Sequence, residues 1–190
     1  MLKKCRYLPR LETERLILRE LTREDADDLR VWIDRDELYT YWGRPINEDE
    51  KNPDLLFTDP LPGKKRRRTS DFIWWIELKS TGKVIGEIEV YDVKDNRFGM
   101  LGYRIDPRLW NTGVCTESIN RVTEFIFTGT DFDRLQANVD VRNTASNRAL
   151  EKCGFTHEGT VRHGKMVSVY CDYNIWGLIR DDYESLKGRE

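Results

Sequence analysis

Residues 111–116 have the composition of a turn that can bind phosphate. They read Asn-Thr-Gly-Val-Cys-Thr and stand between a predicted strand and a predicted helix. Gly113 allows a close approach to the backbone, and Asn111 tolerates a left-handed conformation. Backbone N–H groups at the start of a helix can hold a phosphate, helped by the helix dipole. A single glycine before a helix is a weak fingerprint, so an ordinary strand-to-helix turn explains these residues as well.

The segments around this turn alternate between helical and extended patterns. Apolar residues at 119, 122 and 126 have helical spacing, and the alternation over 135–141 is typical of a half-buried strand. Asn143 can cap the following helix, and Gly154 can end it. The order indicates an α/β fold with a mixed sheet, in one domain over 1–190. In chain order we expect a strand at 15–21, helical pieces from 22, strands at 71–78, 83–91 and 98–105, a helix at 116–127, a strand at 135–141, a helix at 144–153, and strands at 155–162 and 167–178.

The composition restricts the class of protein. The chain has 190 residues with a formal net charge of −2, which argues against a general nucleic-acid binder. Its four cysteines form no CxxC pair and it has two histidines, so we expect reduced thiols and no metal site. The N-terminus has no apolar signal region, and no apolar run has membrane-spanning length. We therefore expect a cytoplasmic protein, either monomer or homodimer, without a membrane partner.

Four motifs occur in a characteristic order. The opening reads TERLILR from Thr13, the segment from Gly102 reads GYRIDP, and the turn reads WNTGVCTE from Trp110. Asn143 stands three residues before Ser146, and a Gly-Phe pair follows. Together they resemble the GNAT superfamily of N-acetyltransferases, specifically its RimJ/RimL-like branch, over nearly the whole chain. The branch has T-x-R-L-x-L-R, GY-x-I/L-x-P, W-G-K-G-Y-A-T-E and N-x-x-S…G-F in these places, and only about 44–70 lacks a counterpart.

This resemblance implies a fold and a reaction. The fold would be a GNAT-like mixed, mostly antiparallel sheet of about seven strands with about four helices. The protein would transfer acetyl from acetyl-CoA directly to a primary amine, either a protein N-terminus or a small amine such as a polyamine or aminoglycoside. Pantetheine would lie between strands 98–105 and 135–141, which splay apart in the family. The implied cofactor-binding residues are Arg104 and Ile105 for pantetheine, Asn111, Thr112, Gly113, Val114, Cys115 and Thr116 for the pyrophosphate, and Asn143 from the far side.

The chain departs from the family pattern at four positions. Asn111 replaces a usual glycine, and Cys115 replaces a usual alanine or glycine, and both are small enough to keep the loop. Leu150 stands where many members have a tyrosine as general acid, and Met100 stands where branch members often have a glutamate. The usual acid and base are therefore missing. Cys115 lies near a helix N-terminus, which favours a lowered thiol pKa, but no base stands beside it for a covalent mechanism.

The candidates for proton transfer are consequently less standard. Glu87 and Glu89 face the same way on one strand and could order a water near the amine, although a solvated sheet face explains them as well. Ser146 could protonate the thiolate, or it could simply bond within the first helical turn. Tyr170 and Tyr173 are further candidate acids, and core packing is their alternative.

Two other features stand outside this pattern. Lys64–Arg68 is a run of five basic residues, which predicts a solvated loop or a surface that docks on acidic protein or ribosomal RNA. Trp32, Trp42, Trp74 and Trp75 lie where the family places its acceptor site, and core packing explains them equally. The missing acid and base also favour a second hypothesis, a CoA-binding protein with little or no catalysis in a regulatory or assembly role.

Overall fold

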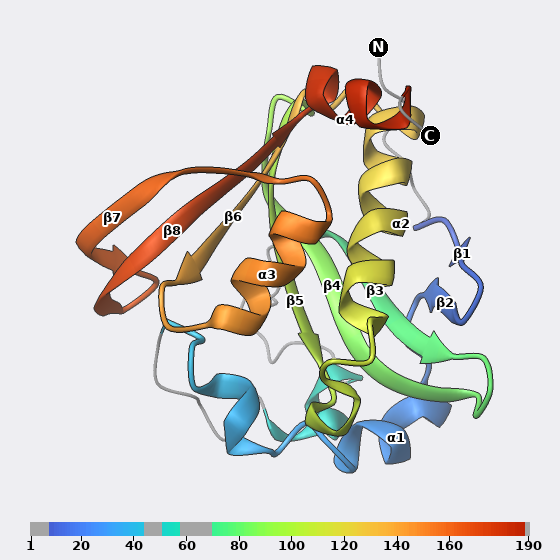
Figure 1. The fold of residues 1–190 in the computed structure, drawn as a ribbon. Helices are drawn as coiled ribbons and strands as arrows, with labels where there is room; N and C mark the ends of the chain where they lie inside the picture. Colours follow the sequence, from blue (N-terminus) through green and yellow to red (C-terminus); the bar gives the residue numbers. More distant parts are fainter. Residues whose placement is uncertain (1–7, 44–50, 58–69, 189–190) are drawn as a thin grey trace.

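The computed structural model describes residues 8–43, 51–57 and 70–188. Cys5 and the basic run at 64–68 lie outside them. Within the described residues, eight strands form one sheet in the order β1-β2-β3-β4-β5-β6-β8-β7 (Figure 1). The β5–β6 pair is parallel and the other pairs are antiparallel, so the predicted mixed sheet is confirmed, with β1 added. The strands are β1 (Leu11–Glu12), β2 (Leu16–Arg19), β3 (Ser70–Leu78), β4 (Lys83–Lys94), β5 (Phe98–Ile105), β6 (Arg134–Asp140), β7 (Thr156–Met166) and β8 (Val169–Ile179).

Four α-helices accompany the sheet in the described part of the chain. They are α1 (Ala26–Arg30), α2 (Val114–Gly129), α3 (Thr144–Lys152) and α4 (Arg180–Lys187). Short 3-10 turns are η1 (Arg23–Asp25), η2 (Asp36–Tyr39), η4 (Pro53–Leu56) and η5 (Pro107–Leu109). The two central helices lie where the sequence predicted them, whereas α4 was not among the predicted elements.

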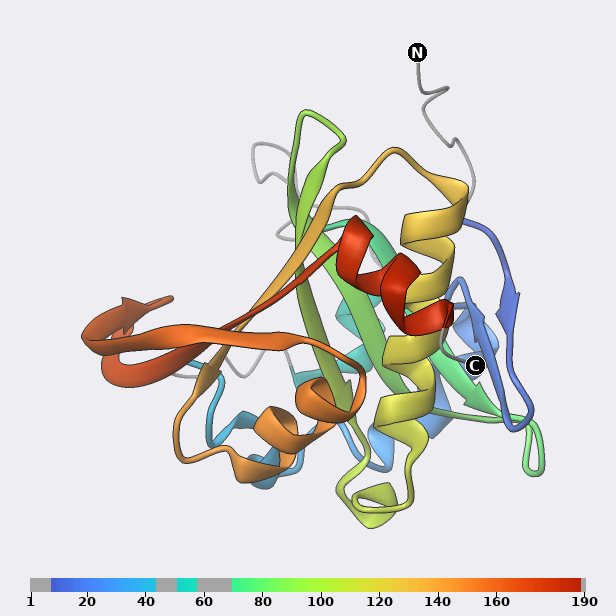
Figure 2. The ribbon, with the colours of Figure 1, turned by 45° about the horizontal axis from the view of Figure 1, so that its top comes forward.

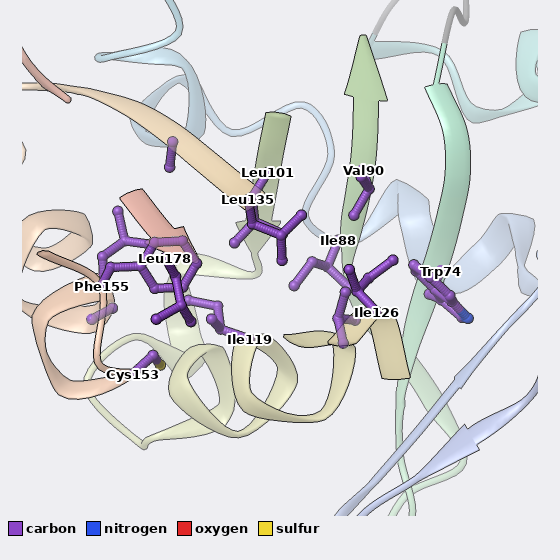
Figure 3. Close-up of a cluster of buried hydrophobic side chains, with 14 of the residues drawn as sticks. Trp74, Ile88, Val90, Leu101, Ile119, Ile126, Leu135, Cys153, Phe155 and Leu178 are labelled. Atoms are coloured by element: carbon purple, nitrogen blue, oxygen red, sulfur yellow. The ribbon is translucent and has the colours of Figure 1, made fainter. Parts of the chain in front are cut away.

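The main core lies between the sheet and α2 with α3. The predicted apolar stripe of α2, Ile119, Val122 and Ile126, is fully buried. Figure 3 shows Ile119 and Ile126 facing side chains of β4, β5, β6 and β8. Burying a side chain of this size stabilises the fold by about 1.5–3 kcal/mol. This packing fixes α2, and with it the turn at its start, against the sheet.

A second core covers the opposite face of the sheet. Trp74 and Trp75 are neighbours on β3, so they point to opposite faces. Trp74 belongs to the main core, whereas Trp75 packs with Trp32 and Ile33 in a cluster beside α1. All three tryptophans are almost fully buried, which confirms core packing as their explanation. The sheet is thus covered on both sides, and α1 with its following segment bounds the second face.

The parallel strands β5 and β6 separate along their length. They pair only at Phe98–Arg134, Gly99–Leu135 and Met100–Gln136, and β5 then continues to Ile105 without β6 beside it. Figures 1 and 2 show the two strands running apart, with α3 next to the opening. The divergence that the family resemblance implied is present. We call the opening between 101–105 of β5 and the C-terminal half of β6 the gap.

Candidate functional site

Backbone groups of alternate β5 residues face the gap. The N–H of Asp106 donates to the carbonyl of Ile85 on β4 at 2.7 Å. Because the two groups of a trans peptide point in opposite directions, the carbonyl of Ile105 is turned away from β4. Antiparallel strands alternate in this respect, so the N–H and C=O groups of residues 101, 103 and 105 face the gap. β5 therefore offers the edge that another extended chain could join.

The two β5 residues expected to bind the cofactor differ in this orientation. The Ile105 carbonyl accepts a 2.9 Å hydrogen bond from the Trp110 indole N–H. The backbone N–H of Ile105 remains directed at the gap. The Arg104 backbone faces β4 instead: a Cβ placed on Gly86 would lie 2.5 Å from the Arg104 carbonyl oxygen. The geometry therefore favours Ile105 as a backbone ligand and disfavours Arg104.

The turn before α2 adopts the conformation that its residues suggested. Asn111 has φ of 62° and Gly113 has φ of 85°, both in the left-handed region. Gly113 is the N-cap of α2 and supplies no side-chain cap. The first N–H groups of an α-helix have no partner inside the helix, so those of residues 114–116 are left for a ligand. Together with the helix dipole, they make this turn suitable for a diphosphate.

A hydroxyl pair links β5 to the first turn of α3. The Tyr103 hydroxyl and the Ser146 hydroxyl lie 2.7 Å apart. Asn143 caps α3, as predicted, by accepting the Ser146 N–H at 3.1 Å through its side-chain oxygen. Burial, more than any neighbouring charge, raises the pKa of Tyr103 well above its usual value of 10. The pair is therefore neutral at physiological pH, and it can donate a hydrogen bond more readily than it can release a proton.

Cys115 corrects one expectation from the sequence. Its position near the helix N-terminus favoured a lowered thiol pKa, but its side chain packs against the main core. Burial raises the pKa of Cys115 to about 12, and it raises that of nearby Cys153 to about 12 as well. The expectation of a lowered pKa was wrong because desolvation outweighs the helix dipole here. The residue shapes the turn without adding a reactive thiolate.

Glu87 is held in a buried ion pair on the second face of the sheet. Its carboxylate lies 2.7 Å from Nε of Arg104 on β5, and both side chains are less than a tenth exposed. The N–H is poorly aligned for a hydrogen bond, so the contact is mainly electrostatic. The carboxylate raises the pKa of Arg104, although burial alone would lower it. Glu87 is thus neither on a solvated face nor readily available as a base.

Three aromatic rings enclose the same guanidinium. Its central carbon lies 5.9, 6.0 and 5.6 Å from the ring centres of Trp32, Tyr39 and Trp42. One terminal nitrogen also donates to the Tyr39 hydroxyl at 3.1 Å. Arg104 therefore anchors the segment around residues 39–42 to the end of β5.

Glu89 is placed differently from Glu87. It is half-buried and lies across Gly102: a Cβ on that glycine would be 3.3 Å from Oε1 of Glu89. The absence of a side chain at Gly102 lets the carboxylate extend over β5, the strand that borders the gap. Glu89 also helps to raise the pKa of Tyr91, after burial as the main cause. Of the two glutamates, Glu89 has the geometry of a candidate base.

Residues 39–43 form a strap across the second face. The Arg142 guanidinium, after the end of β6, lies 5.8 Å from the Tyr41 ring centre. The Gly43 carbonyl accepts the N–H groups of Ser168 and Val169 in the β7–β8 hairpin. The strap therefore spans from the end of β5 past β6 to the hairpin. The sequence did not single out Tyr39, Tyr41 or Gly43, because their contacts are with distant segments.

The two candidate tyrosines of β8 belong to the hairpin. Tyr170 is largely exposed and stacks on His163, with ring centres 5.3 Å apart. Tyr173 lies over Gly164, where an added Cβ would be 2.7 Å from its ring. Neither contact is with β5. In the described part of the chain there is no cluster of potential metal ligands and no helix long and apolar enough to cross a membrane.

Comparison with known proteins agrees with this architecture. The model of a family described as "Acetyltransferase (GNAT) domain" matches residues 15–156. The chain is 34% identical to the uncharacterized N-acetyltransferase YoaA of Bacillus subtilis, over 90% of this chain and 97% of the relative.

Solved structures share the fold at low sequence identity. The ribosomal-protein-S5-alanine acetyltransferase of Vibrio fischeri superposes with a TM-score of 0.74 at 19% identity, over 92% of this chain and 98% of that one. The spermidine N-acetyltransferase of Vibrio cholerae, solved with CoA and spermine, superposes with a TM-score of 0.72 at 20% identity, over 90% and 99%. These likenesses show a common fold.

Proposed function

Because the chain belongs to the GNAT acetyltransferase family, we propose that it transfers the acetyl group of acetyl-CoA directly to a primary amine. The observation that carries the proposal is the gap, a sheet edge with backbone groups of β5 turned toward it. The turn before α2 lies directly after this edge and presents unpartnered helical N–H groups. A ligand with an extended amide chain and a diphosphate would meet both features.

The donor would be held mainly by the backbone. The N–H groups of residues 103 and 105 would bind the pantetheine amides, as another strand would. Amides of residues 113–116 would bind the diphosphate, with Asn111 and Thr112 shaping the turn. The Asn143 side-chain oxygen is used for the α3 cap, so its amide nitrogen would be the group that reaches the donor.

Glu89 would prepare the acceptor. An alkyl amine has a reference pKa of about 10.4, so it must lose a proton before it can attack. A carboxylate, directly or through an ordered water, can accept that proton. Glu89 extends over Gly102 on β5, the strand that borders the gap, whereas Glu87 is buried 2.7 Å from Nε of Arg104. Glu89 adds only a smaller charge interaction with Arg104. We therefore assign Glu89 as the base, and Glu87 a structural role in its ion pair with Arg104.

The remaining steps need a donor for the oxyanion and a group for the leaving thiolate. The acetyl thioester supplies the carbonyl that the neutral amine attacks. A β5 N–H directed at the gap would stabilise the resulting oxyanion. When the C–S bond breaks, Ser146, held by Tyr103, would hydrogen-bond to the thiolate. The proton that Glu89 accepts before the attack leaves to solvent, and the second proton, lost by the attacking nitrogen as the amide forms, is taken up by the thiolate to give free CoA.

The motifs of the chain support one acceptor class over another. The spaced TERLILR and WNTGVCTE motifs resemble the RimJ/RimL-like branch, which supports a protein N-terminal amine. A small amine such as a polyamine is the second acceptor class. A non-catalytic CoA-binding role is the alternative function: Leu150 and Met100, where the usual acid and base would stand, are both buried apolar residues.

An acceptor screen tests the proposal. Wild-type protein would be incubated with acetyl-CoA and a panel of N-terminal peptides, polyamines and aminoglycosides, with release of free CoA as the readout. We expect turnover with at least one amine, and Glu89→Gln should lower kcat at least tenfold while the surface control Glu124→Gln does not. Tight CoA binding without turnover on any amine would instead support the non-catalytic role.

A further inference from the structure

Arg15 connects the N-terminal motif to the turn before α2. The Glu117 carboxylate, in the first turn of α2, accepts the Arg15 backbone N–H at 3.0 Å and its Nε at 2.6 Å. The Thr13 hydroxyl donates to the same carboxylate at 2.5 Å. With its position fixed in this way, Arg15 donates from Nη1 to the Thr112 carbonyl at 2.9 Å. The side chain thus bridges α2 and the turn.

This contact determines where the next N–H points. The Thr112 carbonyl points toward Arg15, to which it is hydrogen-bonded. The Gly113 N–H belongs to the same trans peptide bond, so it points in the opposite direction. The Gly113 N–H is therefore held on the side away from Arg15. The guanidinium also packs against Gly113, since an added Cβ would lie 3.3 Å from Nη2. Arg15 thereby contacts, through its guanidinium, a turn that contains two left-handed residues, Asn111 and Gly113.

We propose that Arg15, held by Glu117, is a positioning residue that orders the turn at 111–116 for the diphosphate of CoA. The inference rests on the proposed function and adds a residue from the opening motif to the donor site. Pre-ordering a binding loop increases affinity because less conformational freedom is lost on binding. The contact also gives a physical reason why the two motifs occur together. Glu117, the last residue of WNTGVCTE, is hydrogen-bonded to Thr13 and Arg15 of TERLILR.

Positioning and simple charge attraction predict opposite effects for one variant. Glu117→Gln removes a negative charge close to the diphosphate, so attraction alone predicts tighter CoA binding. If Glu117 acts by holding Arg15, the same variant binds CoA more weakly, because glutamine has one oxygen where the carboxylate uses two to accept from Thr13, the Arg15 N–H and the Arg15 Nε. Arg15→Lys provides a second distinction, because lysine keeps the charge but cannot reach Glu117 and Thr112 together.

The experiment compares CoA with pantetheine, which lacks the diphosphate and nucleotide. Calorimetry should give CoA dissociation constants about tenfold higher for Arg15→Gln and Glu117→Gln, and several-fold higher for Arg15→Lys. Pantetheine binding should be unchanged in all three. Arg121→Gln is the matched control, since Arg121 also lies on α2 and bonds to the Glu12 carbonyl but does not contact the turn. It should bind both ligands as wild type does.

Several results would overturn the inference. These are wild-type CoA affinity in Arg15→Gln, tighter CoA binding in Glu117→Gln, or an equal loss of CoA and pantetheine affinity. Backbone NMR relaxation of the ligand-free protein supplies a second readout, in which Arg15→Gln should lower the order parameter of Gly113, and an unchanged value would also contradict the inference. If wild-type protein binds no CoA, the proposed function itself fails, which is a distinct outcome from a variant that binds normally.

Discussion

The buried pair of Glu87 and Arg104 leads to a quantitative prediction about stability. Glu87→Gln would remove the negative charge that lies 2.7 Å from Nε of Arg104. The guanidinium would remain between its aromatic neighbours, almost fully removed from water. Breaking a buried ion pair by removing one partner typically costs about 3–5 kcal/mol, because an uncompensated charge stays buried.

We expect a value near the lower end of that range. Glutamine keeps the shape and one hydrogen-bond acceptor, and Arg104 retains its bond to the Tyr39 hydroxyl. The predicted loss in the free energy of unfolding is about 3 kcal/mol, which corresponds to a fall in Tm of roughly 6–12 °C for a domain of this size.

Urea unfolding followed by far-UV circular dichroism would measure this difference. Glu89→Gln serves as the matched control two residues away on the same face, and we expect its stability within about 1 kcal/mol of wild type. The double variant Glu87→Gln/Arg104→Met should recover part of the loss, since it leaves no unpaired charge. A Glu87→Gln protein as stable as wild type would refute the reasoning. So would a double variant whose loss in free energy of unfolding exceeds the sum of the losses of the two single variants.

Three further predictions concern the turn, the thiols and acid stability. Gly113→Val should remain folded but show no rise in Tm with CoA, because valine at φ of 85° is strained and distorts the turn; a normal rise would contradict the site. Cys115 and Cys153 should resist iodoacetamide at pH 8, since burial raises their pKa values to about 12; rapid modification detected by mass spectrometry would count against this packing. Hydrogen bonding from Arg142, the main cause, lowers the pKa of Asp140 below its ordinary 3.8. Stability from this carboxylate is therefore present above about pH 4 and is lost as pH falls through the lowered pKa. Asp140→Asn should lose less stability than wild type between pH 5 and 3, and equal losses would contradict the assignment.

Local patterns predicted much of the fold. The apolar spacing of 119, 122 and 126 located α2, and Asn143 with Gly154 located the ends of α3. These signals are local, because they depend on helical period and on caps. By contrast, α4 has one buried apolar residue, Tyr183. Its sequence therefore has no repeated apolar spacing from which a helix could be predicted.

The parts of the site that the sequence did not predict depend on distant contacts. Glu87 meets Arg104 only through the register of β4 with β5, which periodicity does not specify. Cys115 follows burial rather than the local rule about helix ends. The role of Arg15 needs the N-terminal segment to lie against α2. Each depends on tertiary packing, so residue type and spacing alone could not distinguish the alternatives.

Hydrogen exchange with and without CoA would test the central claim, that the gap and the adjoining turn bind the donor. We predict that CoA slows exchange at the amides of residues 103 and 105 and of 113–116, while the β2–β3 ladder exchanges as before. Protection absent from both segments, or confined to another part of the protein, would contradict the account.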